Sequence, residues 1–154
     1  MVFKNGEDTY HSWLSIMLVA MQFLLIALIM LVGPLWPTLW SVKGMMVLGG
    51  SIALWSFLAM GLGNIRALPE IPQHGRLVVH GPYRWVRHPM YTSLLLITLG
   101  WVVERPMPLR MILWVGLVVT LWVKLCYEEQ FLLARFPEYD AYRLQTNRLI
   151  PLIW

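Results

Sequence analysis

The densest group of polar side chains in this sequence lies in the stretch Gly81–Tyr91, which reads GPYRWVRHPMY. It holds two guanidinium groups, one imidazole and three aromatic rings within a chain that is otherwise mostly apolar. Guanidinium and imidazole groups bind anions, and aromatic faces attract cations. Its Gly-Pro and His-Pro pairs are turn and helix-start signals. The stretch is therefore a candidate binding site at the mouth of the apolar segment that follows it.

A second candidate group consists of Lys124, Glu128 and Glu129, near the end of a long apolar run. Lys124 and Glu128 are four residues apart, so on a helix they share a face. Ionisable groups at membrane depth are costly unless they are paired, which makes them functional candidates. The alternative is an ordinary Lys–Glu pair at the membrane interface, with one free carboxylate.

Simpler roles exist for several of these residues. Arg84, Arg87 and His88 would serve as anchors that hold a helix end at the lipid head groups. Tyr139 and Tyr142 would be interface aromatics. The Ser and Thr residues lack a His–Asp partner set, which argues against a serine hydrolase. No Cys/His spacing resembles a zinc site, so no metal is expected.

The elements that position these groups are predicted to be membrane helices. The chain has 154 residues, 58% of them hydrophobic and 13% charged, against roughly 25% charged in soluble domains. We predict an all-α, polytopic membrane protein with about four transmembrane helices and a cofactor pocket formed by the central loop and the C-terminal region. The four helices are expected at residues 12–32, 43–63, 89–103 and 109–136, and a polar loop at 64–88.

These four helices would place both termini and the polar loop on one side of the membrane. Most of the 12 Lys and Arg residues fall on that side, and the positive-inside rule assigns it to the cytoplasm. The basic residues form no long solvated face, so nucleic-acid binding is not expected. We predict one domain over 1–154, in which 1–63 form a packed antiparallel helix hairpin and 64–154 the catalytic region. Small residues in the second helix suit close packing or a homodimer.

The central stretch, the later CYEEQF and the tail FPEYDAYRLQTNRLIP resemble the small integral-membrane methyltransferases. These are the isoprenylcysteine carboxyl methyltransferases and the phospholipid N-methyltransferases. The resemblance covers about residues 61–151 and rests on RHPMY and the paired glutamates. It implies S-adenosylmethionine as the cofactor and a lipophilic or small amphiphilic acceptor, which is an isoprenylcysteine-like carboxylate, a phospholipid amine or a thiol.

The resemblance also implies residue roles. Lys124 stands where the carboxyl methyltransferase branch has a substrate-facing arginine, and with Arg87 and Arg143 it is expected to orient the acceptor as the catalytic set. The expected cofactor contacts are Gly75, Arg76, Leu77, Val78, Tyr83, His88, Pro89, Met90, Tyr91, Glu128 and Glu129.

Two other functions stay open at this point. Membrane sterol reductases share a similar C-terminal scaffold and bind a nicotinamide cofactor, although they are much larger. A non-enzymatic membrane scaffold is the other alternative. A transporter is disfavoured, because the sequence has no pair of broken membrane helices.

Overall fold

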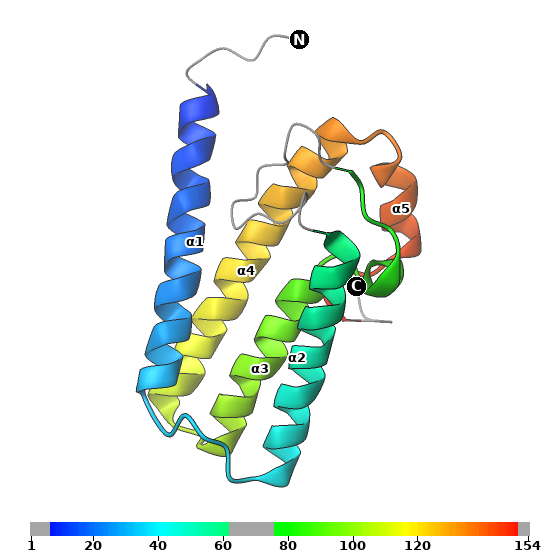
Figure 1. Cartoon of the computed structure of the whole chain (residues 1–154). Helices are drawn as coiled ribbons and strands as arrows, with labels where there is room; N and C mark the ends of the chain where they lie inside the picture. Colours follow the sequence, from blue (N-terminus) through cyan, green and yellow to red (C-terminus); the bar gives the residue numbers. More distant parts are fainter. Residues whose placement is uncertain (1–6, 62–75, 151–154) are drawn as a thin grey trace.

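The computed structural model describes residues 7–61 and 76–150 of the chain. Four long helices run along a common direction, α1 (Glu7–Leu31), α2 (Trp40–Met60), α3 (Pro89–Glu104) and α4 (Pro108–Arg135) (Figure 1). A 3-10 turn, η1 (Gly81–Arg84), precedes α3, and a short helix, α5 (Tyr139–Gln145), follows α4. The described ranges contain no strand, so the predicted all-α membrane architecture is confirmed.

Three of the helices, α1, α2 and α4, are long and apolar enough to cross a membrane. The apolar helix α3 has only 16 residues. At about 1.5 Å per residue it is about 24 Å long, which is less than the roughly 30 Å of a hydrocarbon core. α3 is short at its N-terminal end. The polar turn η1 and the residues after it lie where a longer α3 would have continued. The polar stretch therefore reaches below the level at which the neighbouring helices end.

Proline residues define where the last two long helices begin. Pro89 is the first residue of α3 and Pro108 the first of α4. A proline costs little there, because the N–H that it lacks would have no partner inside the helix. Three features differ from the sequence prediction. α1 begins at Glu7, five residues before the predicted start. α2 begins at Trp40, before the predicted start, and the polar tail contains α5, which was not predicted.

The closest helix contact in the bundle is between α2 and α3. It depends on two glycines that face the partner helix. A Cβ on Gly49 would lie 2.7 Å from Ile97 Cγ1 and 3.1 Å from the Ser93 carbonyl oxygen. A Cβ on Gly100 of α3 would lie 3.3 Å from Met46 Cγ of α2. Small residues thus let the two backbones approach closely, as in other membrane helix pairs.

The predicted packing of the first two helices against each other differs from the structure. α1 lies along α4 and touches α3, whereas α2 lies along α3 (Figure 1). The connection after α1 passes under the end of the bundle and carries the chain to the far side of α3. The short connection in the sequence is therefore long enough to separate the two helices. A core of Ile29, Leu117 and Leu121 joins α1 to α4.

Two charged side chains fix the helix ends at this lower end of the bundle. Arg110 is fully buried and donates hydrogen bonds to the carbonyl oxygens of Ile29 (3.1 Å) and Trp101 (2.6 Å), in the last turns of α1 and α3. Glu104 accepts hydrogen bonds from the backbone N–H groups of Thr38 (2.7 Å) and Leu39 (3.2 Å), before α2. The cation thus meets helix C-termini and the anion a helix N-terminus, which the helix dipoles favour.

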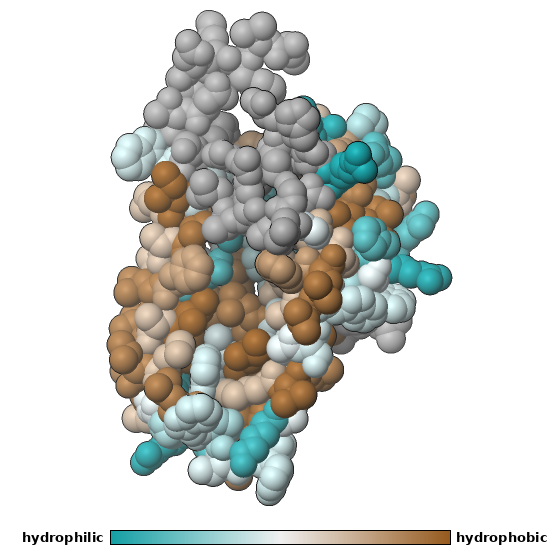
Figure 2. Space-filling model, viewed as in Figure 1, coloured by the Kyte–Doolittle hydropathy of each residue, from teal (hydrophilic) through white to brown (hydrophobic). Residues whose placement is uncertain are grey.

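Hydrophobic side chains cover most of the length of the bundle, and hydrophilic ones lie toward its two ends (Figure 2). Large exposed apolar residues occur on every long helix, for example Met17, Leu58, Val103 and Ile112. A surface of this kind is far larger than the apolar patches of soluble monomers. It is the surface of an integral membrane protein.

Candidate active site

The candidate site lies at the upper end of the bundle, where α2 and α4 end and α3 begins (Figure 1). η1 turns the chain under the end of α2. Gly81 starts it with a φ of +63°, which favours glycine, and a Cβ there would lie 2.9 Å from Ala59 Cβ. The close approach brings Trp85 against Trp55 of α2, with ring centroids 5.7 Å apart. The polar stretch is therefore seated firmly on the bundle.

The C-terminal segment runs beside the polar stretch and pairs with it. Val86 and Asn147 form an isolated parallel bridge. The N–H of Arg87 donates to the Asn147 carbonyl oxygen (2.7 Å), and that of His88 to the Arg148 carbonyl oxygen (3.1 Å). The backbone direction of both arginine and histidine is thus set by a segment about 60 residues later in the chain.

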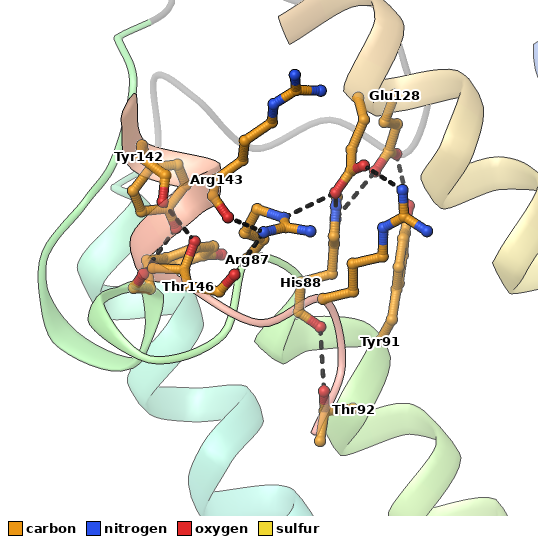
Figure 3. Close-up of polar contacts among 11 residues, drawn as sticks. Arg87, His88, Tyr91, Thr92, Glu128, Tyr142, Arg143 and Thr146 are labelled. Carbon is orange, nitrogen blue, oxygen red and sulfur yellow. Dashed lines mark hydrogen bonds and ion pairs between the residues drawn. The ribbon is translucent and has the colours of Figure 1, made fainter. Parts of the chain in front are cut away.

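Three cationic or basic side chains surround the carboxylate of Glu129. Arg87 Nε donates to its Oε1 at 2.8 Å, and Arg148 Nη2 lies 3.2 Å from its Oε2. His88 Nε2 lies 3.5 Å from Oε1 without forming a hydrogen bond (Figure 3). Glu129 is buried, and each oxygen faces an arginine. Glu129 therefore acts as the anchor that joins α4 to the polar stretch and the tail.

Within the described residues, the side chain of Arg87 makes its hydrogen bonds inside this framework. Its Nη1 donates to the carbonyl oxygens of Arg143 (2.8 Å) and Thr146 (2.5 Å), at the end of α5. Figure 3 shows this guanidinium between α5 and the glutamates of α4. Since Arg87 binds Glu129 as well, it holds α4, α5 and the start of α3 together. These contacts support a positioning role.

Glu128 belongs to a different face of the site. The Tyr91 hydroxyl donates to its Oε1 at 2.5 Å, and His88 Nδ1 lies 3.6 Å from its Oε2. The rings of His88 and Tyr91 are stacked, with centroids 5.6 Å apart and planes 5° apart (Figure 3). Glu128 is only partly buried, in contrast to Glu129. This face offers a carboxylate, an imidazole and a phenol ring to a ligand.

Lys124 lies one helical turn before Glu128 and closes the site on its membrane side. It is 3% exposed, and its Nζ lies 5.2 Å from the centre of the Tyr91 ring. The same ammonium donates a hydrogen bond of 3.0 Å to Gln22 Oε1 of α1. A residue of the first helix therefore reaches the site.

Two tyrosines outside the membrane helices complete the surroundings. The Tyr142 hydroxyl of α5 donates to the Tyr83 carbonyl oxygen at 2.6 Å. The Tyr83 hydroxyl is buried and has no hydrogen-bond partner among the described residues. Burial, together with Tyr142 and Glu128, raises the pKa of Tyr83, and burial raises the pKa of Tyr142 to about 12. Both phenols stay protonated at neutral pH, so Tyr83 has a free donor for a ligand.

The structure brings most of the predicted site residues together. Tyr83, His88, Tyr91, Glu128 and Glu129 surround one region, with Lys124 beside it. Pro89 and Met90 form the first turn of α3, and the Met90 carbonyl accepts a hydrogen bond from Ser93 Oγ. The roles of these residues stay predictions.

The remaining predicted residues lie elsewhere. Arg76, Leu77 and Val78 form an irregular segment before η1, with Arg76 exposed, and Gly75 falls outside the described residues. The Arg143 guanidinium pairs with Asp140 (2.9 Å) on the exposed side of α5. Only the carbonyl oxygen of Arg143 contacts the site, through Arg87.

Four contributors were not predicted as site residues: Gln22, Tyr142, Asn147 and Arg148. A signal for Gln22 does exist, because it is the one amide side chain in the apolar segment 12–32. Asn147 and Arg148 lie in the tail that carried part of the family resemblance. Their partners in the polar stretch could not be read from the sequence, since backbone pairing across about 60 residues leaves no local pattern.

A comparison with protein-family models gives one match. The phospholipid methyltransferase model covers residues 37–138, which is more than half of the chain. This chain belongs to the phospholipid methyltransferase family. A search among curated proteins found no similar sequence. With its apolar helices, this phospholipid methyltransferase family member is a membrane methyltransferase in its general class.

The family match includes the polar stretch, α3 and α4, and with them both glutamates and Lys124. It leaves out α1 and α5 and the tail. Gln22, Tyr142 and Arg148 therefore lie outside the part of the chain that the phospholipid methyltransferase family defines. These outer segments nevertheless supply contacts to the site.

Proposed function

We propose that this protein transfers the methyl group of S-adenosylmethionine to a lipophilic or amphiphilic acceptor. The observation that supports this best is the face formed by His88, Tyr91 and Glu128 at the mouth of the bundle. In a chain of the phospholipid methyltransferase family, a cluster of this kind at one end of the apolar helices suits a polar cofactor and an apolar acceptor together.

The donor set of the site fits the chemistry of this cofactor. S-adenosylmethionine carries a sulfonium, an ammonium, a carboxylate and ribose hydroxyls. The Glu128 carboxylate suits the ammonium or a ribose hydroxyl, and the Tyr91 ring suits the sulfonium by cation–π attraction. The Tyr83 hydroxyl, which has no hydrogen-bond partner among the described residues, remains as a group for the cofactor's polar atoms.

When bound, S-adenosylmethionine supplies an electrophilic methyl group on a cationic sulfur. Held by Glu128, Tyr91 and Tyr83, it would give this methyl group to the acceptor's lone pair, and the electrons of the carbon–sulfur bond would stay on sulfur. The protein's contribution is then mainly to hold the two reactants in line, which alone can lower a barrier by several kcal/mol. The network of Arg87, Glu129 and Arg148 keeps the site in one geometry for this purpose.

The acceptor is expected to come from the membrane. The site lies below the upper helix ends because α3 is short, so a lipophilic molecule can approach from the side while the cofactor enters from water. An isoprenylcysteine-like carboxylate, a phospholipid amine and a thiol are all within this proposal. A screen of these three acceptor types with labelled S-adenosylmethionine would distinguish them.

The proposal is tested by calorimetric binding of S-adenosylhomocysteine to the purified protein. The Glu128→Gln variant is expected to bind about 10-fold to 100-fold more weakly, because hydrogen bonds to charged groups contribute about 1.5–3 kcal/mol. Glu138→Gln is the matched control, since Glu138 is exposed between α4 and α5. It should bind like the parent.

Three outcomes would contradict the proposal. A folded parent protein that does not bind S-adenosylhomocysteine would exclude the cofactor. Binding that Glu128→Gln leaves unchanged would place the cofactor elsewhere. Binding of a nicotinamide dinucleotide instead would favour a reductase.

The orientation in the membrane belongs to the same proposal. The basic residues Arg84, Arg135, Arg143 and Arg148 lie at the site end, and Lys43, Arg105 and Arg110 at the other. By the positive-inside rule the site and both termini face the cytoplasm.

A further inference from the structure

A second cavity lies between η1 and α5, outside the face that suits the cofactor. Its volume is about 430 Å³, and its walls come from the chain around η1 and from the end of α5: Val79, Arg84, Trp85, Tyr142, Gln145 and Thr146. Figure 3 shows Tyr142 and Thr146 on the opposite side of Arg87 from Glu128 and Tyr91. The cavity is therefore separate from the Glu128 and Tyr91 face.

Arg84 gives this cavity a cation that the protein does not neutralise. Its side chain is exposed and has no hydrogen bond or ion pair among the described residues. By contrast, Arg87 and Arg148 both contact Glu129. The exposed amide of Gln145 also has no partner within the described part of the chain. A guanidinium has five N–H donors and an amide two, so the cavity suits an anion with several oxygens, such as a phosphate.

The depth of the cavity decides which phosphate can reach Arg84. The Trp85 ring packs on Trp55 of α2, with centroids 5.7 Å apart. At about 1.5 Å per residue, Trp55 lies about 8 Å before the end of α2 at Met60. Tryptophan rings gather at the level of the lipid head groups. The cavity therefore lies at this level, where lipid phosphates surround the protein.

Apolar surface adjoins the cavity and favours a lipid over a phosphate dissolved in water. Val79, Trp85 and Trp55 are each about half exposed. The glycerol group and the first acyl carbons of a lipid would cover these side chains, which a water-soluble phosphate would leave in contact with water. Cationic pockets at a membrane surface are typical sites for anionic lipids.

We infer that this cavity binds the head group of an anionic phospholipid, as a bound ligand that is not methylated. The phosphate would contact Arg84 and the Gln145 amide, and the acyl chains would lie beside Trp55. The Tyr142 hydroxyl already joins α5 to the Tyr83 carbonyl oxygen (2.6 Å). A lipid across the cavity would stabilise the same junction between η1 and α5. The inference does not depend on the proposed function.

The test compares dioleoyl-phosphatidylglycerol with dioleoyl-phosphatidylcholine. Phosphatidylglycerol has no amine, carboxylate or thiol, so it is none of the proposed acceptors. Each lipid is added to the purified, delipidated protein in detergent micelles, and native mass spectrometry measures how much of it the protein retains. The parent should retain one phosphatidylglycerol about fivefold more strongly than phosphatidylcholine, which is the factor expected from one basic residue near an anionic head group.

Substitutions at two exposed arginines distinguish this cavity from general charge. Arg84→Gln should lose the preference for phosphatidylglycerol, and Arg84→Lys should keep most of it. Arg143→Gln removes the same charge at the same end of the protein, but Arg143 pairs with Asp140 and does not line the cavity. It should keep the full preference.

Thermal unfolding gives a second readout. Phosphatidylglycerol should raise the unfolding temperature of the parent and of Arg143→Gln, because it binds the folded state. It should not raise that of Arg84→Gln. Since Arg84 lies outside the cofactor face, Arg84→Gln should bind S-adenosylhomocysteine within about twofold of the parent.

Three results would show that the inference is wrong. The first is equal retention of the two lipids by the parent. The second is an equal loss of preference in Arg84→Gln and Arg143→Gln. The third is an equal rise of the unfolding temperature with glycerol 3-phosphate, which would mean that the cavity binds a water-soluble phosphate and not a lipid. If the parent prefers phosphatidylglycerol through Arg84 but binds no S-adenosylhomocysteine, the proposed function fails and this inference stands.

Discussion

The adjacent glutamates of α4 have different partners, and this separates their expected roles. Glu129 is enclosed by Arg87, Arg148 and His88, so its carboxylate is already neutralised by the protein. Glu128 accepts one hydrogen bond from Tyr91 and remains partly exposed. Loss of Glu129 should therefore damage the fold of the site, because buried cations would lose their anion. Loss of Glu128 should mainly weaken ligand binding.

The tyrosines outside the membrane helices give a pH-dependent prediction. Burial raises the pKa values of Tyr83, Tyr139 and Tyr142, the last to about 12. Above about pH 10 the unfolded chain gives up these protons while the folded protein keeps them. The free energy of unfolding should therefore fall as the pH rises above 10. Tyrosinate absorbance of folded and denatured protein measures the difference, and Tyr142→Phe should reduce it. Identical titration curves for the two states would contradict this prediction.

The sequence motifs predicted which residues would meet in the site. They did not predict which of these residues would bind a ligand and which would hold the site together. His88, Tyr91 and Glu128 were expected from RHPMY and the paired glutamates, and they do meet. Arg87 was expected to orient the acceptor, yet its donors bind Glu129 and two backbone carbonyls. Sequence indicates which groups are present, whereas the number of donors left free depends on the folded neighbours.

At the scale of the helices, the α2–α3 contact provides a matched pair of substitutions. Gly49→Ala should destabilise the protein by roughly 1–3 kcal/mol, since the new Cβ would lie 2.7 Å from Ile97 Cγ1. Gly50 is the neighbouring residue, and no atom lies within 4 Å of a Cβ placed there. Gly50→Ala should be neutral or stabilising by up to about 1 kcal/mol, because alanine favours helix. Thermal unfolding in detergent measures both.

Two results would contradict the prediction for Gly49 and Gly50. Equal effects of the two alanines would mean that α2 does not contact α3 through Gly49. A shift of the midpoint for Gly50→Ala alone would point to a partner on the other face of α2.

The positions of the long helices could be predicted from the sequence. Which helix packs against which could not. Runs of apolar residues bounded by Pro and Gly predicted the ends of α3 and α4 to within one residue, and those of α1 and α2 to within five. The partner of α1 depends on Arg110 and on the Ile29 core, which join residues about 80 positions apart. α5 has only seven residues of mixed polarity, too few for a hydrophobic period to show.

At the scale of the whole molecule, the proposed orientation predicts which end can be labelled from outside a cell. Cys126 is first replaced by Ala, and one new cysteine is then introduced at an exposed position at either end. Gln145→Cys lies at the site end and Arg105→Cys at the opposite end. An impermeant maleimide should label Arg105→Cys in intact cells, and Gln145→Cys only after permeabilisation. The reverse pattern would place the site outside the cytoplasm.

The short α3 also affects the lipid around the protein. Its length of about 24 Å leaves Arg84 and Trp85 at a depth where hydrocarbon would otherwise stand. A bilayer accommodates such hydrophobic mismatch by thinning locally. We therefore expect lipid head groups beside η1 to lie nearer to the bilayer centre than elsewhere around the protein. An acceptor anchored in the membrane would then move a shorter distance along the bilayer normal to reach the site than it would in a bilayer of full thickness. We also expect the protein to prefer thinner membranes.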